Sequence, residues 1–318
     1  MQPVRGVRTI LGAESAGGVD WQAARRAARQ LSDPGELDLI PAEEEAYAED
    51  VAVARTRIEA ATGLEITLPG SLEVQNRHHW IDRTAGTLER ALDPIEPEAA
   101  RFPGLTAAVN TGTVAGALAH LSGLVLGQYD PHLFDPGAEH ELLVVHPNVQ
   151  AGARELSVAP DTFRRWIVFH EVAHAAEFAQ APWLPEYLAD RMARVLEAVA
   201  AGTAPRHVIH ELDLAMTAVE GYAELLMDEA FDGPTAALRS ALDDRRARSG
   251  PVAGIVARLL GLDRKRDQYE QGRAFFAAIA EQRGLQGANR VWERPEHLPR
   301  GGEIEDPTTW LDRVGPGE

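Results

Sequence analysis

The chain of 318 residues contains no cysteine, and only one of its residues, Lys265, is a lysine. Without thiols it can form neither disulfides nor thiolate metal sites, so any bound zinc must be held by histidine and carboxylate side chains. The scarcity of lysine means that arginine supplies nearly all of the positive charge. The absence of cysteine therefore limits the metal chemistry to nitrogen and oxygen ligands.

Positive charge is also in short supply, because 31 basic residues face 49 acidic ones and the net charge is -18. Such a surface repels phosphate backbones, so we do not expect nucleic acid as a partner. The acidic excess has two competing explanations, a salt-rich cytoplasm and GC-rich coding that favours arginine. Both predict a prokaryotic host, either halophilic or of high GC content.

Strongly apolar stretches are missing as well. Residues 1–20 lack the apolar core of a signal peptide, so we expect a cytoplasmic protein. The segment Leu105 to Leu126 has no charged residue and carries glycines at four-residue spacing, but it also contains several polar residues, including His120. We therefore predict a buried central helix with His120 as a hydrogen-bonded core residue, and no membrane partner.

Capping and turn signals divide most of the chain into helices, so the predicted fold class is mainly α with a small β edge. The apolar run Glu141 to His146 predicts the strand. Adjacent histidines, His78 and His79, point to different sides of a helix and make a poor metal site. The predicted helices are Trp21 to Leu31, Glu43 to Ala61, Gln75 to Leu92, Leu105 to Leu126, Pro160 to Gln180, Glu186 to Ala200, His207 to Ala230, Pro234 to Ala247, Val252 to Leu260 and Arg264 to Gly284.

Three regions follow from this pattern, and we expect them to form one compact unit. Residues 1–100 form an N-terminal helical region, residues 101–235 a zinc-binding catalytic core, and residues 236–318 the C-terminal helices and an extended tail. Trp292 and Trp310 lie among prolines in that tail, which predicts that it is anchored on the body of the protein.

The motif His170-Glu171-Val172-Ala173-His174 is the most informative part of the sequence. On a helix, positions i and i+4 share one face, so both imidazoles can reach one metal ion, and Glu171 can contact a water molecule beside it. This arrangement predicts a Zn²⁺ hydrolase with Glu171 as general base.

A catalytic zinc takes three protein ligands, so one more ligand must come from elsewhere. No histidine follows His174 closely, which leaves a carboxylate on a second helix. Glu220 is our first choice, because Glu220-Gly221-Tyr222-Ala223 resembles the segment that carries the third ligand in thermolysin-related aminopeptidases. Glu224 is the alternative, because Glu224 to Asp228 fits the E-x-x-x-D pattern of thermolysin itself.

The remaining parts of the predicted site are an oxyanion donor and a substrate groove. Tyr222, Tyr129 and His210 are the candidates for the donor, and Tyr222 is the first of them. Zinc peptidases commonly hold an extended substrate against a strand edge, so a groove along Leu142 to His146 is a candidate for the binding of a peptide or protein substrate.

Several segments together resemble the zincin-like metallopeptidase family of actinobacteria and archaea, one branch of which is associated with deazaflavin coenzyme biosynthesis. The similar segments are Arg164 to His174, Pro182 to Leu184, Leu121 to Gly123, Gly127 to Asp130 and Glu220 to Glu224. The likeness extends from about Asp50 to Trp310. It implies a mostly helical zincin of the HExxH-plus-glutamate type, with His170, His174 and a glutamate as ligands.

Three functional interpretations remain open from the sequence. The first is a zinc-dependent metallopeptidase, in which Glu171 activates water for attack on a peptide carbonyl. The second is a zinc-stabilised binding or regulatory protein without turnover, linked to coenzyme biosynthesis. The third is an amidohydrolase that does not act on peptides.

Overall fold

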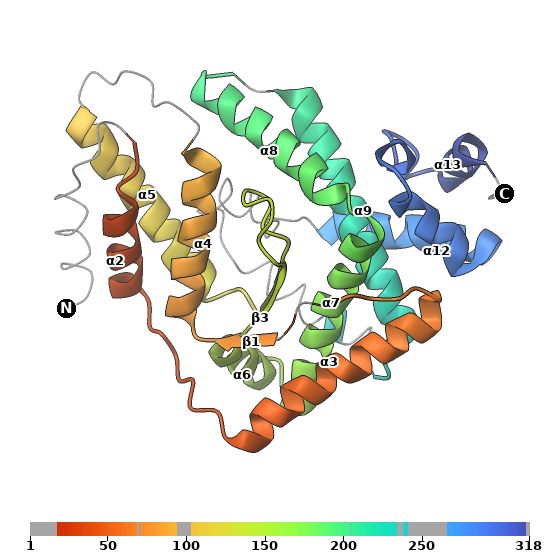
Figure 1. Ribbon diagram of the computed structural model, residues 1–318, viewed down its shortest axis with the longest axis horizontal. Coiled ribbons are helices and arrows are strands. Elements are labelled where there is room, and N and C mark those ends of the chain that lie inside the picture. Colours follow the sequence, from red (N-terminus) through yellow and green to blue (C-terminus); the bar gives the residue numbers. More distant parts are fainter. Residues whose placement is uncertain are drawn as a thin grey trace.

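The computed structural model is built mainly from helices, as predicted, with one small sheet near the middle of the molecule (Figure 1). It describes residues 18–68, 70, 72–93, 103–203, 205–233, 238–240 and 266–315. The helices predicted at Pro234 to Ala247 and Val252 to Leu260 fall largely or wholly outside these residues. In chain order the elements are α2 (Trp21–Leu31), α3 (Pro41–Thr62), β1 (Leu72–Gln75), α4 (Arg77–Leu92), α5 (Pro103–Ser122), β2 (Gly127–Asp130), β3 (Glu141–Val145), α6 (His146–Glu155), α7 (Pro160–Gln180), α8 (Leu184–Ala200), α9 (Arg206–Ala230), α12 (Arg266–Asn289), η2 (Arg290–Trp292), η3 (Pro295–His297) and α13 (Pro307–Val314).

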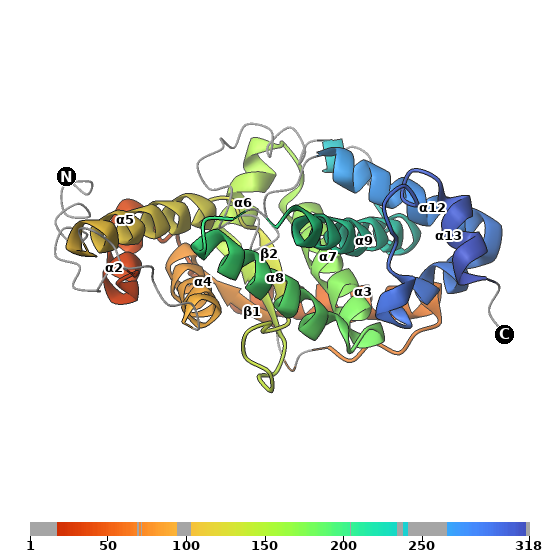
Figure 2. The ribbon, with the colours of Figure 1, turned by 90° about the horizontal axis from the view of Figure 1, so that it is seen from above.

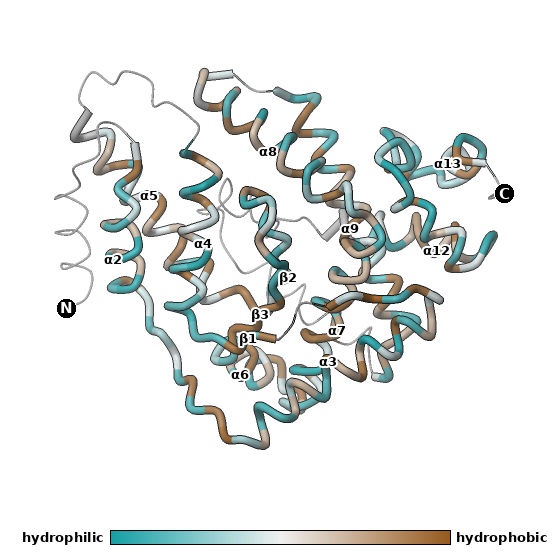
Figure 3. The backbone as a smooth tube through the Cα atoms, in the orientation of Figure 1, coloured by the Kyte–Doolittle hydropathy of each residue, from teal (hydrophilic) through white to brown (hydrophobic). Residues whose placement is uncertain are grey.

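The sheet has three strands in the order β1-β3-β2. β3 pairs in parallel with β1 and antiparallel with β2, so its Leu-Leu-Val-Val run is buried and apolar (Figure 3). The predicted strand is confirmed as β3, but it is the central strand and not an edge. Strands β1 and β2 were not predicted from the sequence, because each has only four residues. The Leu-Glu-Val-Gln run of β1 does alternate apolar and polar side chains, but it is too short to stand out, and the Gly-Gln-Tyr-Asp run of β2 has no such alternation.

Two predicted helix boundaries are wrong for local reasons, and one helix was not predicted. The helix expected from Gln75 begins at Arg77, because Asn76 caps it by accepting from the backbone N–H groups of two following residues. The helix expected to reach Leu126 ends at Ser122, and Gly127 starts a strand instead. The helix α6 was not predicted; it begins directly after β3, and Pro147 in its first turn suits that position because proline lacks the N–H that would be unpaired there.

Buried apolar side chains of the described residues form two clusters. The larger one surrounds α7 and α9, and the smaller one joins α2, α4 and α5. The helices α2 and α13 lie at opposite ends of the molecule in both views (Figures 1 and 2). Helix α5 is therefore peripheral rather than central, and His120 on it is exposed, so both predictions about this segment are wrong. No helix among the described residues is long and apolar enough to cross a membrane.

Helix α7 is held from two sides. On α3, the carboxylate of Asp50 is only 1% exposed and accepts from Arg164 Nε at 2.7 Å and Arg165 Nε at 2.9 Å. A buried carboxylate requires such partners, so this contact fixes the first turns of α7 against α3. Helix α9 packs on the other side of α7, within the same cluster.

Helix α9 is in turn supported by α12 at a crossing of two glycines. A Cβ placed on Gly221 would lie 2.3 Å from the carbonyl carbon of Gly272, and one on Gly272 would lie 2.4 Å from Thr217 O. Because any side chain at either position would collide with backbone, this close approach requires glycine. It sets the distance between α9 and α12.

The C-terminal segment is anchored as predicted, although it is largely helical instead of extended. Trp292 and Trp310 are buried, and Trp310 Nε1 donates to His297 O at 2.7 Å. Trp183 Nε1, at the start of α8, donates to Trp292 O at 2.9 Å. The segment after α12 therefore closes over the larger cluster beside α8 and α9.

Candidate metal centre

His170 and His174 lie on one face of α7 with their Nε2 atoms 3.3 Å apart. Both follow from the helical spacing of the motif, and both side chains are largely buried. Small neighbours on α7, Ala173 and Ala176, are completely buried and let other elements approach the helix. The two imidazoles can therefore contact one ion.

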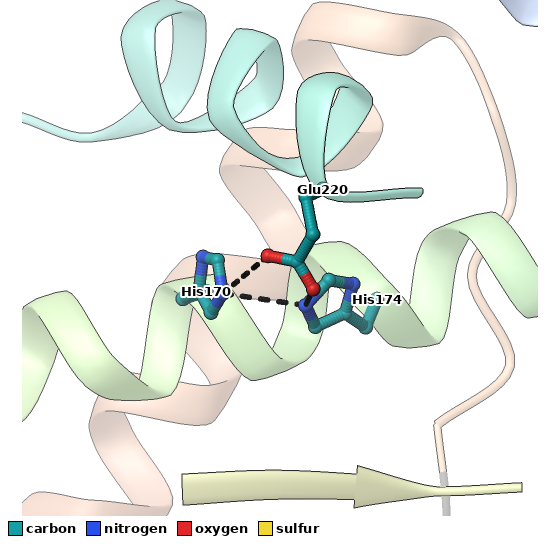
Figure 4. A group of neighbouring side chains, drawn as sticks. All are labelled: His170, His174 and Glu220. Carbon is teal, nitrogen blue, oxygen red and sulfur yellow. Dashed lines mark hydrogen bonds and ion pairs between the residues drawn. The ribbon is translucent and has the colours of Figure 1, made fainter. Parts of the chain in front are cut away.

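Glu220 enters the same space from α9 and points toward both histidines (Figure 4). Its Oε2 lies 3.6 Å from His170 Nε2, and its Oε1 lies 3.6 Å from His174 Nε2. Donor atoms that are each about 2.1 Å from one tetrahedral zinc lie about 3.4 Å from one another. The three side chains thus fit a zinc ion with little movement.

Glu224, the alternative ligand, is placed elsewhere, one turn further along α9. Its Oε2 accepts from Arg239 Nε at 2.5 Å, and Arg239 also donates to Asp228 at 3.1 Å. These two carboxylates raise the pKa of Arg239 against the opposing effect of its burial. The carboxylate of Glu224 therefore serves an ion-pair network and is not part of the His170–His174–Glu220 group.

Glu171 is held by the strand β2. Its Oε2 accepts from the backbone N–H of Tyr129 at 2.8 Å. A Cβ on Gly127 would lie 2.7 Å from Glu171 Cγ, so the strand lies directly against this carboxylate. Neither contact was predicted from the sequence. A hydrogen bond from the backbone N–H of Tyr129 and a close approach of the Gly127 backbone to Glu171 leave no recognisable pattern of residue types.

A further carboxylate, Glu177, was missed although its spacing could have revealed it. It follows His174 by three residues on α7, which places both on one face. His174 Nδ1 donates to Glu177 Oε2 at 2.9 Å, and Glu177 is completely buried. The motif is thus extended to H-E-x-x-H-x-x-E.

The hydroxyl groups of Tyr222 and Tyr129, two of the three predicted oxyanion donors, contact residues other than the metal ligands, and the third candidate, His210, is exposed. Tyr222 is buried, and its hydroxyl donates to Asn289 Oδ1 at 2.5 Å. Burial, followed by the charge of Glu177, raises the pKa of Tyr222. The Tyr129 hydroxyl contacts His140 Nδ1, and His210 is exposed near the start of α9. The hydroxyl of Tyr222 thus links α9 to the end of α12.

Asp130, His132 and Glu141 form a second group of potential ligands among the described residues. Arg83 donates to Glu141 and, at 2.5 Å, to Glu73, so a guanidinium already supplies positive charge there. His132 Nε2 lies 3.4 Å from Glu141 Oε2, but His132 Nδ1 is 4.0 Å from Asp130 Oδ1. We assign this group to an ion-pair network at the base of the β2–β3 loop.

The predicted substrate groove along Leu142 to His146 is wrong, because β3 is paired on both sides. Leu142 does line a groove of about 1100 Å³, together with Leu72 and Val74 of β1 and with side chains of α3. None of its lining residues belongs to the metal-ligand group. The strand beside that group is β2, which is an edge strand and contacts Glu171.

The comparison with known protein families agrees with this metal-ligand geometry. The profile of the zincin-like metallopeptidase family matches residues 19–206 and 198–311. The chain therefore belongs to the zincin-like metallopeptidase family.

A solved structure has a similar fold over most of the chain. It is a crystal structure from Chloroflexus aurantiacus described as "a putative hydrolase with a novel fold". It is 32% identical to this chain, covers 94% of it and 100% of its own length, and has a TM-score of 0.78. A comparison with curated proteins found no match.

Proposed function

We propose that this protein is a zinc-dependent hydrolase that cleaves amide bonds in peptides, with His170, His174 and Glu220 as the zinc ligands. The observation that carries the proposal is the set of 3.3 to 3.6 Å distances among the two imidazole Nε2 atoms and the two carboxylate oxygens of Glu220, which come from two helices. These distances are close to the separation of about 3.4 Å that is expected between ligand atoms around one tetrahedral zinc ion. Membership of the family supports the same metal.

Bound by these residues, zinc would polarise a substrate carbonyl and lower the pKa of a coordinated water toward about 7. Glu171 follows His170 directly on α7, and its carboxylate is held on β2 by the N–H of Tyr129. A carboxylate in this position accepts a proton from the attacking water and returns it to the leaving amine. Its role is to move that proton, while the three ligands hold the metal.

Changing Glu171 to Gln tests this division of roles. The variant keeps its size and loses its basicity, so we expect bound zinc to remain at the wild-type level. Cleavage of a broad peptide library should fall by about 100-fold or more. Zinc is measured by elemental analysis of the purified protein, and cleavage by mass spectrometry of the library.

The matched control is Glu303→Gln, which removes another buried carboxylate far along the chain, paired with Arg313 at 2.6 Å. It should retain both zinc and activity. Activity that survives Glu171→Gln would refute Glu171 as the base. Zinc without cleavage of any peptide by the wild type would support a binding protein, and turnover of other amides would indicate a non-peptidase amidohydrolase.

A further inference from the structure

We propose that Glu177 is a positioning residue that orients the zinc ligand His174 and strengthens its bond to the metal; this inference rests on the proposed function. The evidence is the 2.9 Å contact between His174 Nδ1 and Glu177 Oε2 on one face of α7. Metal-bound histidines commonly donate their second ring nitrogen to a carboxylate in this way.

The complete burial of Glu177 indicates that its carboxylate interacts with a specific partner, because a buried carboxylate without one is costly. The residue is 0% exposed, although leaving the carboxylate in water would be less costly. Its charge also contributes to the raised pKa values of Tyr129 and Tyr222, where burial is the larger cause. The charge of Glu177 therefore acts on a tyrosine of β2 and on a tyrosine of α9.

The contact determines which nitrogen of His174 faces the metal. An ionised carboxylate only accepts, so Nδ1 carries the proton and Nε2 presents its lone pair. That Nε2 atom is the one 3.3 Å from His170 Nε2 and 3.6 Å from Glu220 Oε1. With the other tautomer, a proton would point into the site and block coordination. The negative charge of Glu177 also makes the imidazole a stronger donor.

The experiment measures zinc affinity by competition with a chromophoric chelator at constant pH. We expect Glu177→Gln, which can still accept the hydrogen bond, to bind zinc about 10-fold more weakly than wild type. We expect Glu177→Ala, which loses both the bond and the charge, to bind it up to about 100-fold more weakly. The d–d spectrum of the cobalt-substituted protein should change in both variants, since the geometry of His174 changes.

A purely structural role is distinguished by the difference in Tm between zinc-bound and zinc-free protein. Loss of a structural contact lowers both values equally, whereas loss of a positioning contact reduces their difference. The control Glu303→Gln should lower both equally and leave the zinc affinity unchanged.

Zinc affinities within about threefold of wild type for Glu177→Gln and Glu177→Ala would overturn the proposal. If the alanine variant does not fold, the glutamine variant decides alone. Wild-type protein that binds no zinc would instead refute the proposed function.

Discussion

Gly127 on β2 lies so close to Glu171 on α7 that a Cβ added to the glycine would be 2.7 Å from both Cγ and Oε1 of the glutamate. Two residues further along the strand, the N–H of Tyr129 donates to Oε2 of the same carboxylate. The strand therefore determines where this side chain can lie, through backbone atoms alone.

Gly127→Ala should displace the Glu171 carboxylate and weaken its hydrogen bond to Tyr129 N. Because about 1 Å of misplacement can cost about 100-fold in rate, we expect kcat/KM to fall by about 10- to 100-fold. Zinc content should not change. The control is Gly116→Ala on α5, where the added Cβ meets nothing within 4 Å. Its activity should equal that of wild type, and equal activity of Gly127→Ala would contradict the prediction.

Glu220→Gln and Glu224→Gln should differ in their effect on bound zinc. The first removes a proposed ligand, so zinc should be lost under dialysis. The second leaves zinc bound but removes the anionic partner of Arg239, and should lower the free energy of unfolding by about 1–3 kcal/mol. Zinc analysis and urea denaturation of both variants check this. Zinc loss only in Glu224→Gln would reverse the assignment.

The protein should bind one zinc ion per chain, because Arg83 already supplies positive charge to Glu141 of the Asp130–His132–Glu141 group. His132→Ala should therefore keep the zinc content of wild type, and His170→Ala should lose it. Elemental analysis after exhaustive dialysis measures both. A second equivalent that disappears in His132→Ala would show that this group binds metal.

Stability should fall as the pH drops below the ordinary histidine pKa, in part because of His146. Burial, aided by Arg164, lowers the pKa of His146 from its ordinary value of 6.5, while Glu43 opposes the shift. The unfolded chain therefore takes up this proton first on acidification, and the folded state loses stability below about pH 6.5. Burial lowers the pKa of His140 as well, so protonation of His140 also destabilises the folded state on acidification.

His146→Gln should make this decline shallower without removing it. Urea midpoints of the metal-free protein between about pH 7 and pH 5 provide the measurement, and removal of zinc avoids effects from protonation of its ligands. In the wild type, His146 Nδ1 is hydrogen-bonded to the hydroxyl of Tyr47 at 3.0 Å. Because the substitution weakens or removes this bond, the variant is also expected to be less stable at neutral pH. An unchanged slope would contradict the role of His146.

Some parts of the candidate site could be predicted because they depend on helical periodicity. His170, Glu171 and His174 are close in sequence, and the capping and turn signals predicted α7 and α9 almost to their ends. By contrast, His120 was expected to be buried because its helix is apolar. The structure exposes it because α5 packs mainly against α2 and α4 at one end of the molecule, and His120 lies on the side of α5 that faces solvent.

The sequence by itself determined the mainly helical fold class and the H-E-x-x-H group, and it predicted a carboxylate from a second helix as the third ligand. Only the tertiary structure placed Glu220, and not Glu224, beside the two histidines, because His174 and Glu220 are 46 positions apart and both glutamates occur on the same helix. The distinction depends on how α9 is seated, on α7 on one side and against α12 at Gly221 and Gly272 on the other. The backbone contacts of β2 with Glu171 likewise exist only after folding, since any residue offers an N–H and its direction is set by the packed chain.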